Sequence, residues 1–112
     1  MSAGLRPAGA LLPPGDAPGV DLLPDPAGVS SAAELAAVLR RYRAWWGDPP
    51  YRAIAERSGT RVAPSTLWQA LRAETAVPRL DVVLAVVAGC GGGEEDQRRF
   101  ASAWRSIRLA AA

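Results

Sequence analysis

Residues 51–72, YRAIAERSGTRVAPSTLWQALR, contain two short segments with helical periodicity on either side of a glycine. The pattern predicts two helices joined by a tight turn, the second of which presents polar side chains outward. Ala55 is small enough to let the two helices approach closely, and Gly59 tolerates the positive φ with which helices commonly end. Leu67 then faces inward and anchors the second helix, with these residues on its flanks and outer side: Ser65, Thr66, Trp68 and Gln69.

The composition of the 112 residues excludes several classes of protein. The length corresponds to one domain, and no run approaches the roughly 20 apolar residues that cross a bilayer. Histidine is absent and Cys90 is the single cysteine, so an intramolecular disulfide and a Cys/His metal site are both ruled out. We therefore expect a protein of the reducing cytoplasm with no cofactor, no metal and no membrane contact.

The N-terminal segment, residues 1–29, differs in composition from the rest of the chain. Its first 28 residues contain six prolines and five glycines, and too few apolar side chains to offset the entropy of ordering them. We predict a disordered tail over residues 1–29 and a folded domain over residues 30–112. The net charge of the tail is negative, so it is not expected to act as a basic arm for DNA. Its leucines leave two interpretations open, a spacer, which is favoured, or a segment that docks in the groove of a protein partner.

The folded part begins with a predicted helix that runs to about Trp46. Ser31 and Glu34 have the spacing of a capping box, in which each side chain satisfies a backbone N–H of the other residue. Apolar residues then recur at helical spacing: Leu35, Val38, Leu39, Tyr42, Trp45 and Trp46. Arginines flank this stripe, where they lie either along a phosphate backbone or in solvent: Arg40, Arg41 and Arg43.

The second helix is predicted to start after Asp48, which caps it, with Pro49 in its first turn. Arg52 is then near the helix N-terminus, where it can reach a phosphate to which the helix offers its own N–H groups. Tyr51 either makes the same contact or packs as a half-buried residue. Arg52 is the better candidate for a phosphate contact.

An apolar run over residues 82–87 predicts a helix at the centre of the core. Asp81 in its first turn suits the helix dipole, and Arg79 just before it is a candidate phosphate contact. The glycines of residues 89–93 are interpreted as a flexible connector, because a phosphate-binding loop needs a preceding strand and a lysine. Cys90 has no histidine to activate it and is interpreted as a small buried residue.

A last helix is predicted from Glu94, with acids at its start and arginines further along, the order that the helix dipole favours. Phe100, Trp104 and Ile107 form its apolar stripe. The stripe either closes the bundle, which is the favoured interpretation, or forms part of a homodimer seam.

Taken together, these segments resemble the Cro/repressor-type, xenobiotic-response-element-like helix-turn-helix proteins, in the form common in actinobacteria. The matching pieces are LRRYRAWWGDPPYRAIAERSG, PSTLWQAL and VPRLDVVLAVVAGCGG, followed by the helix with Phe100 and Trp104. The resemblance implies a compact bundle of four or five helices whose PSTLWQAL helix enters the major groove. It places the DNA contacts on these positions: Pro64, Ser65, Thr66 and Gln69. The connection after Gly59 is about two residues longer than usual, which either tilts this helix or brings Arg61 against the DNA backbone.

The residue types on the outer face suit DNA independently of the resemblance. Gln69 can bond adenine through two hydrogen bonds. Ser65 and Thr66 can bond several base edges. Arg72 can pair with guanine or with a phosphate. Trp68 either packs against a neighbouring helix, which is favoured, or contacts a thymine methyl group or a sugar.

Positive charge is concentrated on the same part of the chain. Residues 40–80 carry eight arginines and three acids, whereas the whole chain has a formal charge of only +2. Such a patch raises sequence-independent DNA affinity through counterion release.

We therefore predict an all-α helix-turn-helix domain that acts as a sequence-specific transcriptional regulator, binds double-stranded DNA, possesses no enzymatic activity and associates with the nucleoid. The candidate contacts are Arg52, Arg61, Ser65, Thr66, Trp68, Gln69, Arg72 and Arg79. Homodimerisation would match two half-sites. The alternative is a non-enzymatic adaptor that uses the same scaffold to bind another protein.

Overall fold

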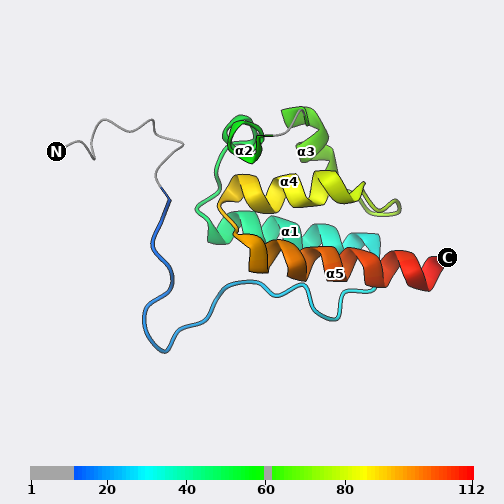
Figure 1. The fold of residues 1–112 in the computed structure, drawn as a ribbon, viewed down its shortest axis with the longest axis horizontal. Helices are drawn as coiled ribbons and strands as arrows, with labels where there is room; N and C mark the ends of the chain where they lie inside the picture. Colours follow the sequence, from blue (N-terminus) through cyan, green and yellow to red (C-terminus); the bar gives the residue numbers. More distant parts are fainter. Residues whose placement is uncertain (1–11, 60–61) are drawn as a thin grey trace.

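The computed structural model describes residues 12–59 and 62–112, which form five α-helices and no strand (Figure 1). The helices are α1 (Ala32–Trp45), α2 (Tyr51–Ser58), α3 (Pro64–Ala70), α4 (Leu80–Cys90) and α5 (Glu94–Ala111). The predicted all-α class is therefore confirmed. None of the helices in these ranges has the length and apolar character needed to cross a membrane.

Helix α4 lies at the centre of the fold and contacts every other helix. Figure 1 shows α2 and α3 on one side of α4, and α1 and α5 on the other. The position follows from the composition of α4, which is apolar almost all round. Its buried residues are Val82, Val83, Ala85, Val86, Val87, Gly89 and Cys90.

Helix α1 begins with the predicted Ser31 cap, although the reciprocal bond differs from the prediction. The Glu34 backbone N–H donates to the Ser31 hydroxyl oxygen at 3.1 Å. The Glu34 carboxylate accepts from the backbone N–H of Ser30 at 2.7 Å, whereas the capping box predicted Ser31 as this donor. Both side chains still satisfy backbone donors at the helix start, which stabilises the first turn.

Asp48 does not cap α2, so that prediction was wrong. The N-cap is Pro50, in an extended conformation with φ −65° and ψ 150°, and no side chain bonds the first turn. The extended prolines carry Asp48 away from the helix start, and Asp48 itself has a positive φ of 56°. Its carboxylate lies 3.7 Å from the Arg43 guanidinium instead. At the other end of α2, Gly59 adopts the predicted left-handed conformation with φ 66°.

Residues 91–93 connect α4 to α5, but Gly89 lies within α4, and three of the four glycines in residues 89–93 are points of close packing that the interpretation as a flexible connector did not anticipate. Gly89 lies within α4, and a Cβ atom there would overlap the backbone of Ile54 in α2. A Cβ atom on Gly92 would meet the Tyr42 hydroxyl, and one on Gly91 would meet the Trp46 ring. The absence of side chains at these positions lets α2 and α1 lie directly against the end of α4.

Helix α5 closes the bundle through its apolar stripe, as favoured from the sequence. Phe100 and Ile107 are 1% and 8% exposed. The ring of Phe100 makes an edge contact with that of Tyr42 at 5.0 Å between centroids. The Tyr42 hydroxyl also donates a hydrogen bond to the Asp96 carboxylate at 2.6 Å.

The described part of the N-terminal segment, residues 12–29, has no helix or strand but does contact the helical domain. Pro24 and Pro26 are buried, and Leu23 and Val29 pack against the core. Proline has no backbone N–H, so its burial leaves no unsatisfied donor. Leu11, one of the leucines that the alternative interpretation docks in a partner, lies outside the described ranges together with the residues before it. The domain boundary after residue 29 stays a prediction.

Asp16, nearer the N-terminus, adds a further contact between this segment and the domain. The Asp16 carboxylate accepts a hydrogen bond from the Trp45 indole N–H at 3.1 Å. It also accepts one from the Leu22 backbone N–H at 2.8 Å. The first bond joins the segment to the end of α1, and the second lies within the segment.

Candidate nucleic-acid interface

Helix α3 has a buried side and an exposed side, and the exposed side carries most of the predicted contacts. Leu67, Ala70 and Leu71 are buried in the core, with Leu67 as the predicted inward anchor. The exposed residues of this segment are Pro64, Ser65, Trp68, Gln69 and Arg72, and Thr66 is half-buried. The N-cap is Ala63 and Pro64 occupies the first turn, a position that proline favours.

Trp68 is 46% exposed. The favoured interpretation, that it packs against a neighbouring helix, stays a prediction. The Arg72 guanidinium carbon lies over the indole ring, 4.1 Å from the ring centroid. Because the two residues are four positions apart around the end of α3, their side chains lie on the same side of the segment. The pair is stabilised by a cation–π interaction on an exposed surface.

Tyr51 connects this pair to helices α1 and α2. Its hydroxyl oxygen accepts a long hydrogen bond of 3.5 Å from Nη1 of Arg72. On the same ring, the Arg43 guanidinium carbon lies 4.4 Å from the centroid. Arg43 is itself fixed, because its Nε donates to the Pro49 carbonyl at 2.9 Å. We call Arg43, Tyr51, Arg72 and Trp68 the stacked cluster.

Arg40 has a structural contact that the sequence did not reveal. Its Nη1 donates to the backbone carbonyl of Leu71 at 2.6 Å, across 31 residues of chain. This bond satisfies a carbonyl at the C-terminal end of α3, where helical partners run out. No local pattern signals such a contact, since its two residues come from different elements.

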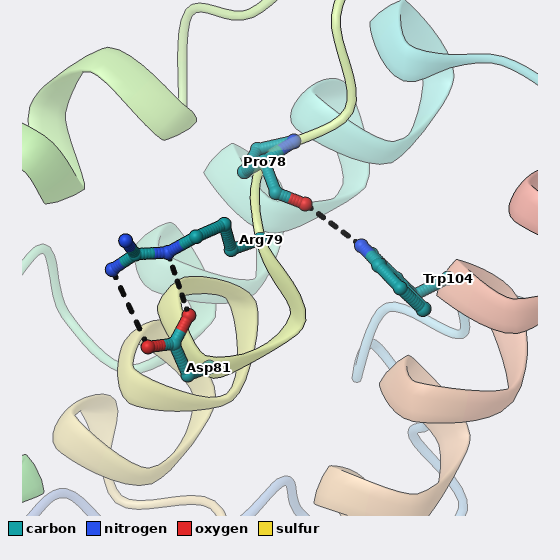
Figure 2. A network of polar contacts seen from close by, with 4 residues as sticks. All are labelled: Pro78, Arg79, Asp81 and Trp104. Carbon is teal, nitrogen blue, oxygen red and sulfur yellow. Dashed lines mark hydrogen bonds and ion pairs between the residues drawn. The ribbon is translucent and has the colours of Figure 1, made fainter.

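Arg79 is exposed but paired with an acid. Figure 2 shows its guanidinium side by side with the Asp81 carboxylate, to which Nε donates at 3.1 Å. The same figure shows the Trp104 indole N–H of α5 donating to the Pro78 carbonyl at 2.7 Å, which ties the start of α4 to α5. The positive charge of Arg79 is therefore partly compensated within the protein.

The remaining predicted contacts are placed as follows. Arg52 is exposed in the first turn of α2. Arg61 lies in residues 60–61, outside the described ranges. Thr66, Gln69 and Arg79 line a groove of about 390 Å³ between α3 and the start of α4, together with Val77 and Val82.

The buried titratable groups lie in the core and not in this interface. Burial raises the pKa of the Cys90 thiol to about 12, against the opposing charges of Arg43 and Arg57. Burial also raises the pKa of Tyr42 far above its usual range, and its hydrogen bond to Asp96 adds to the shift. Both groups are therefore neutral at physiological pH. Within the described ranges, no three His, Cys, Asp or Glu side chains gather as a metal site would require.

Comparisons with protein-family models, with curated proteins and with solved structures found no match. The resemblance to helix-turn-helix proteins therefore stays an expectation from the sequence. The case for a function rests on the side chains of α2 and α3 and their geometry.

Proposed function

We propose that the protein is a sequence-specific transcriptional regulator that binds double-stranded DNA with α3 in the major groove. The observation that carries the proposal is the two-sided character of α3. Its buried side is anchored to the core by Leu67, and its exposed side offers hydroxyl, amide, indole and guanidinium groups together. An exposed helix with this set of groups matches what a recognition helix needs.

The individual side chains support different parts of recognition. Gln69 can form two hydrogen bonds with adenine, and the hydroxyl of Ser65 can bond several base edges. Arg52 is exposed in the first turn of α2, where a guanidinium can contact a phosphate. Base contacts would then come from α3, while α2 supports the position of the protein on the DNA.

We further propose that the protein is cytoplasmic, associates with the nucleoid, needs no cofactor and has no enzymatic activity. Homodimerisation on paired half-sites is part of the proposal. The stripe of α5 is an unsuitable seam, because Phe100 and Ile107 are already buried within one chain. A dimer would therefore use another surface.

A second candidate function is a non-enzymatic adaptor that binds a protein through its N-terminal segment. The observation that favours it is a set of exposed apolar side chains in that segment: Leu12, Val20 and Leu22, which are 47%, 47% and 67% exposed. Such side chains can contribute to a protein interface. DNA binding remains the first candidate, since the adaptor leaves the exposed groups of α3 without a use.

The test is selection of bound duplexes from random and genomic pools at two salt concentrations, about 50 and about 200 mM. We expect enrichment of a defined motif whose affinity falls steeply with salt, and a two-fold symmetric motif would support the dimer. Salt-sensitive binding without a motif would contradict sequence specificity. A protein that binds no duplex at either salt would contradict DNA binding and favour the adaptor.

A further inference from the structure

Arg72 differs from the ion-paired arginines in the groups that hold it. The ion pairs of the described residues involve other arginines: Arg43, Arg79, Arg98 and Arg99. Arg72 contacts only an indole ring and a phenol hydroxyl among the described residues. Both groups are neutral, so they orient the guanidinium without compensating its charge.

The contacts of Arg72 also leave one side of its guanidinium available. Nη1 is directed to the Tyr51 hydroxyl, and Trp68 covers one face of the group. The side formed by Nε and Nη2 carries two parallel N–H donors and has no hydrogen-bond partner among the described residues. Two parallel donors on a rigid fork match two oxygens of a phosphate group.

We infer that the stacked cluster forms a preorganised phosphate clamp, in which Arg72 binds one DNA phosphate and Tyr51 positions Arg72. The inference rests on the proposed function. Arg72 lies two positions beyond the last residue of α3, whereas base contacts come mainly from the N-terminal part of a recognition helix. A contact with the DNA backbone, and not with a base, therefore fits the position of Arg72.

Tyr51 and Trp68 reduce the cost of binding because the arginine side chain is already ordered. A free arginine loses rotamer entropy when it grips a phosphate, and preorganisation removes part of this cost. Arg43 completes the cluster by lying against the Tyr51 ring from α1. Residues from three helices thus hold one guanidinium in place.

The experiment measures duplex affinity and its salt dependence for the full chain and for Arg72→Ala, on a selected motif and on unrelated duplexes. We expect Arg72→Ala to weaken binding about tenfold on every sequence. The slope of log affinity against log salt should become shallower by about 0.9, the value for one phosphate. Arg72→Lys should keep the slope but not the affinity, since lysine retains the charge and lacks the fork.

The role of Tyr51 is tested with Tyr51→Phe, which removes the hydroxyl and keeps the ring. The variant should weaken binding about threefold in the full chain and have no effect when Arg72 is already alanine. If Tyr51→Phe has the same effect with and without Arg72, Tyr51 does not act through Arg72 and the inference is wrong.

Arg108→Ala is the matched control, because the Arg108 guanidinium carbon lies over the Trp104 ring, 5.9 Å from its centroid. Both residues are on α5, on the other side of α4 from α3 (Figure 1). An Arg72→Ala variant that binds like this control, while the full chain binds DNA, would overturn the clamp and leave the proposed function intact. A loss confined to one base position would show base recognition in place of a phosphate contact. A full chain that binds no duplex would overturn the proposed function and the clamp together.

Discussion

The α2–α3 side of the molecule and the exposed surface of α5 are both rich in arginine, but Arg98 and Arg99 on α5 have different partners from Arg72. On α5, Arg98 pairs with Glu94 at 2.8 Å and Arg99 with Glu95 at 3.0 Å. On the α2–α3 side, Arg72 is held by one neutral ring and a hydroxyl. The number of arginines on a surface therefore says less about its function than the groups that surround them.

The environment of Arg99 illustrates the compensated case. Its hydrogen bond to Glu95 raises the pKa of the guanidinium, and the charges of Glu95, Asp25 and Asp96 act in the same direction. An arginine among carboxylates presents a weak field to an approaching phosphate. The field of Arg72 is not weakened by a paired carboxylate, which supports the proposed DNA contact on the α2–α3 side.

The largest effect is expected from Gly89→Ala, which should displace α2 from α4 and so disturb the α2–α3 side of the molecule. Alanine is favoured over glycine in a helix interior by about 1 kcal/mol. The added Cβ atom would nevertheless overlap the Ile54 backbone, so we expect a net loss of about 3 kcal/mol in the free energy of unfolding. Urea unfolding monitored by circular dichroism measures it.

The control for this variant is Gly93→Ser at the N-cap of α5, where an added Cβ atom meets nothing within 4 Å. Serine is a good N-cap residue, so stability should be kept or slightly raised. A Gly89→Ala protein as stable as the natural one would show that α2 and α4 do not need this close approach.

Gln69→Ala tests whether the α2–α3 side distinguishes DNA sequences. We expect preference at one base pair to fall by about 1 to 3 kcal/mol, because a bidentate contact is lost. Competition between duplexes that differ at single positions measures the preference. Gln97→Ala on α5 is the control, and unchanged preference in Gln69→Ala would remove this residue from base recognition.

Deletion of residues 1–28 tests the N-terminal segment, whose described part runs along the side of α1 and α5 (Figure 1). The composition alone predicts no change in stability, whereas the burial of Pro24 and Pro26 leads us to expect a loss of about 1 kcal/mol. Thermal melting measures the loss. DNA affinity below the melting transition should be unchanged, and a large drop in affinity would contradict the separation of the two sides.

The smallest effect is expected from the double substitution Arg98→Ala and Arg99→Ala. Both arginines are already paired on an exposed helix surface, so duplex affinity should change by about twofold or less. The same measurement on Arg52→Ala should show a larger loss and a shallower salt slope. Equal losses in the two proteins would show that total charge, and not its placement, governs binding.

Local features of the chain were predictable where a single element determines them. Apolar periodicity predicted α1 and α5, and the apolar run predicted the central position of α4. Gly59 ends α2 in the left-handed conformation, and Leu67 is buried, as their residue types indicated. In each case the physical cause acts within a few residues of the position itself.

Apart from the caps of α1 and α2, the errors concern contacts between elements distant in sequence. Gly89 was interpreted as part of a connector because its neighbour in space, Ile54, lies 35 positions away in the chain. The same holds for Arg40, whose partner is Leu71, and for Pro24, whose burial depends on the assembled helices. Local propensity carries no information about such partners.

The sequence by itself determined the all-α class, the order of the helices and the residue types exposed around Leu67, because helix formation and amphipathicity depend on local spacing. Tertiary structure alone decided the contacts between residues distant in the sequence. Arg72 donates to the Tyr51 hydroxyl 21 positions away and Arg40 to the Leu71 carbonyl 31 positions away, whereas Arg79 pairs with Asp81 only two positions along the chain. The reason is that these hydrogen bonds need short distances between donor and acceptor, which only the packed helices define.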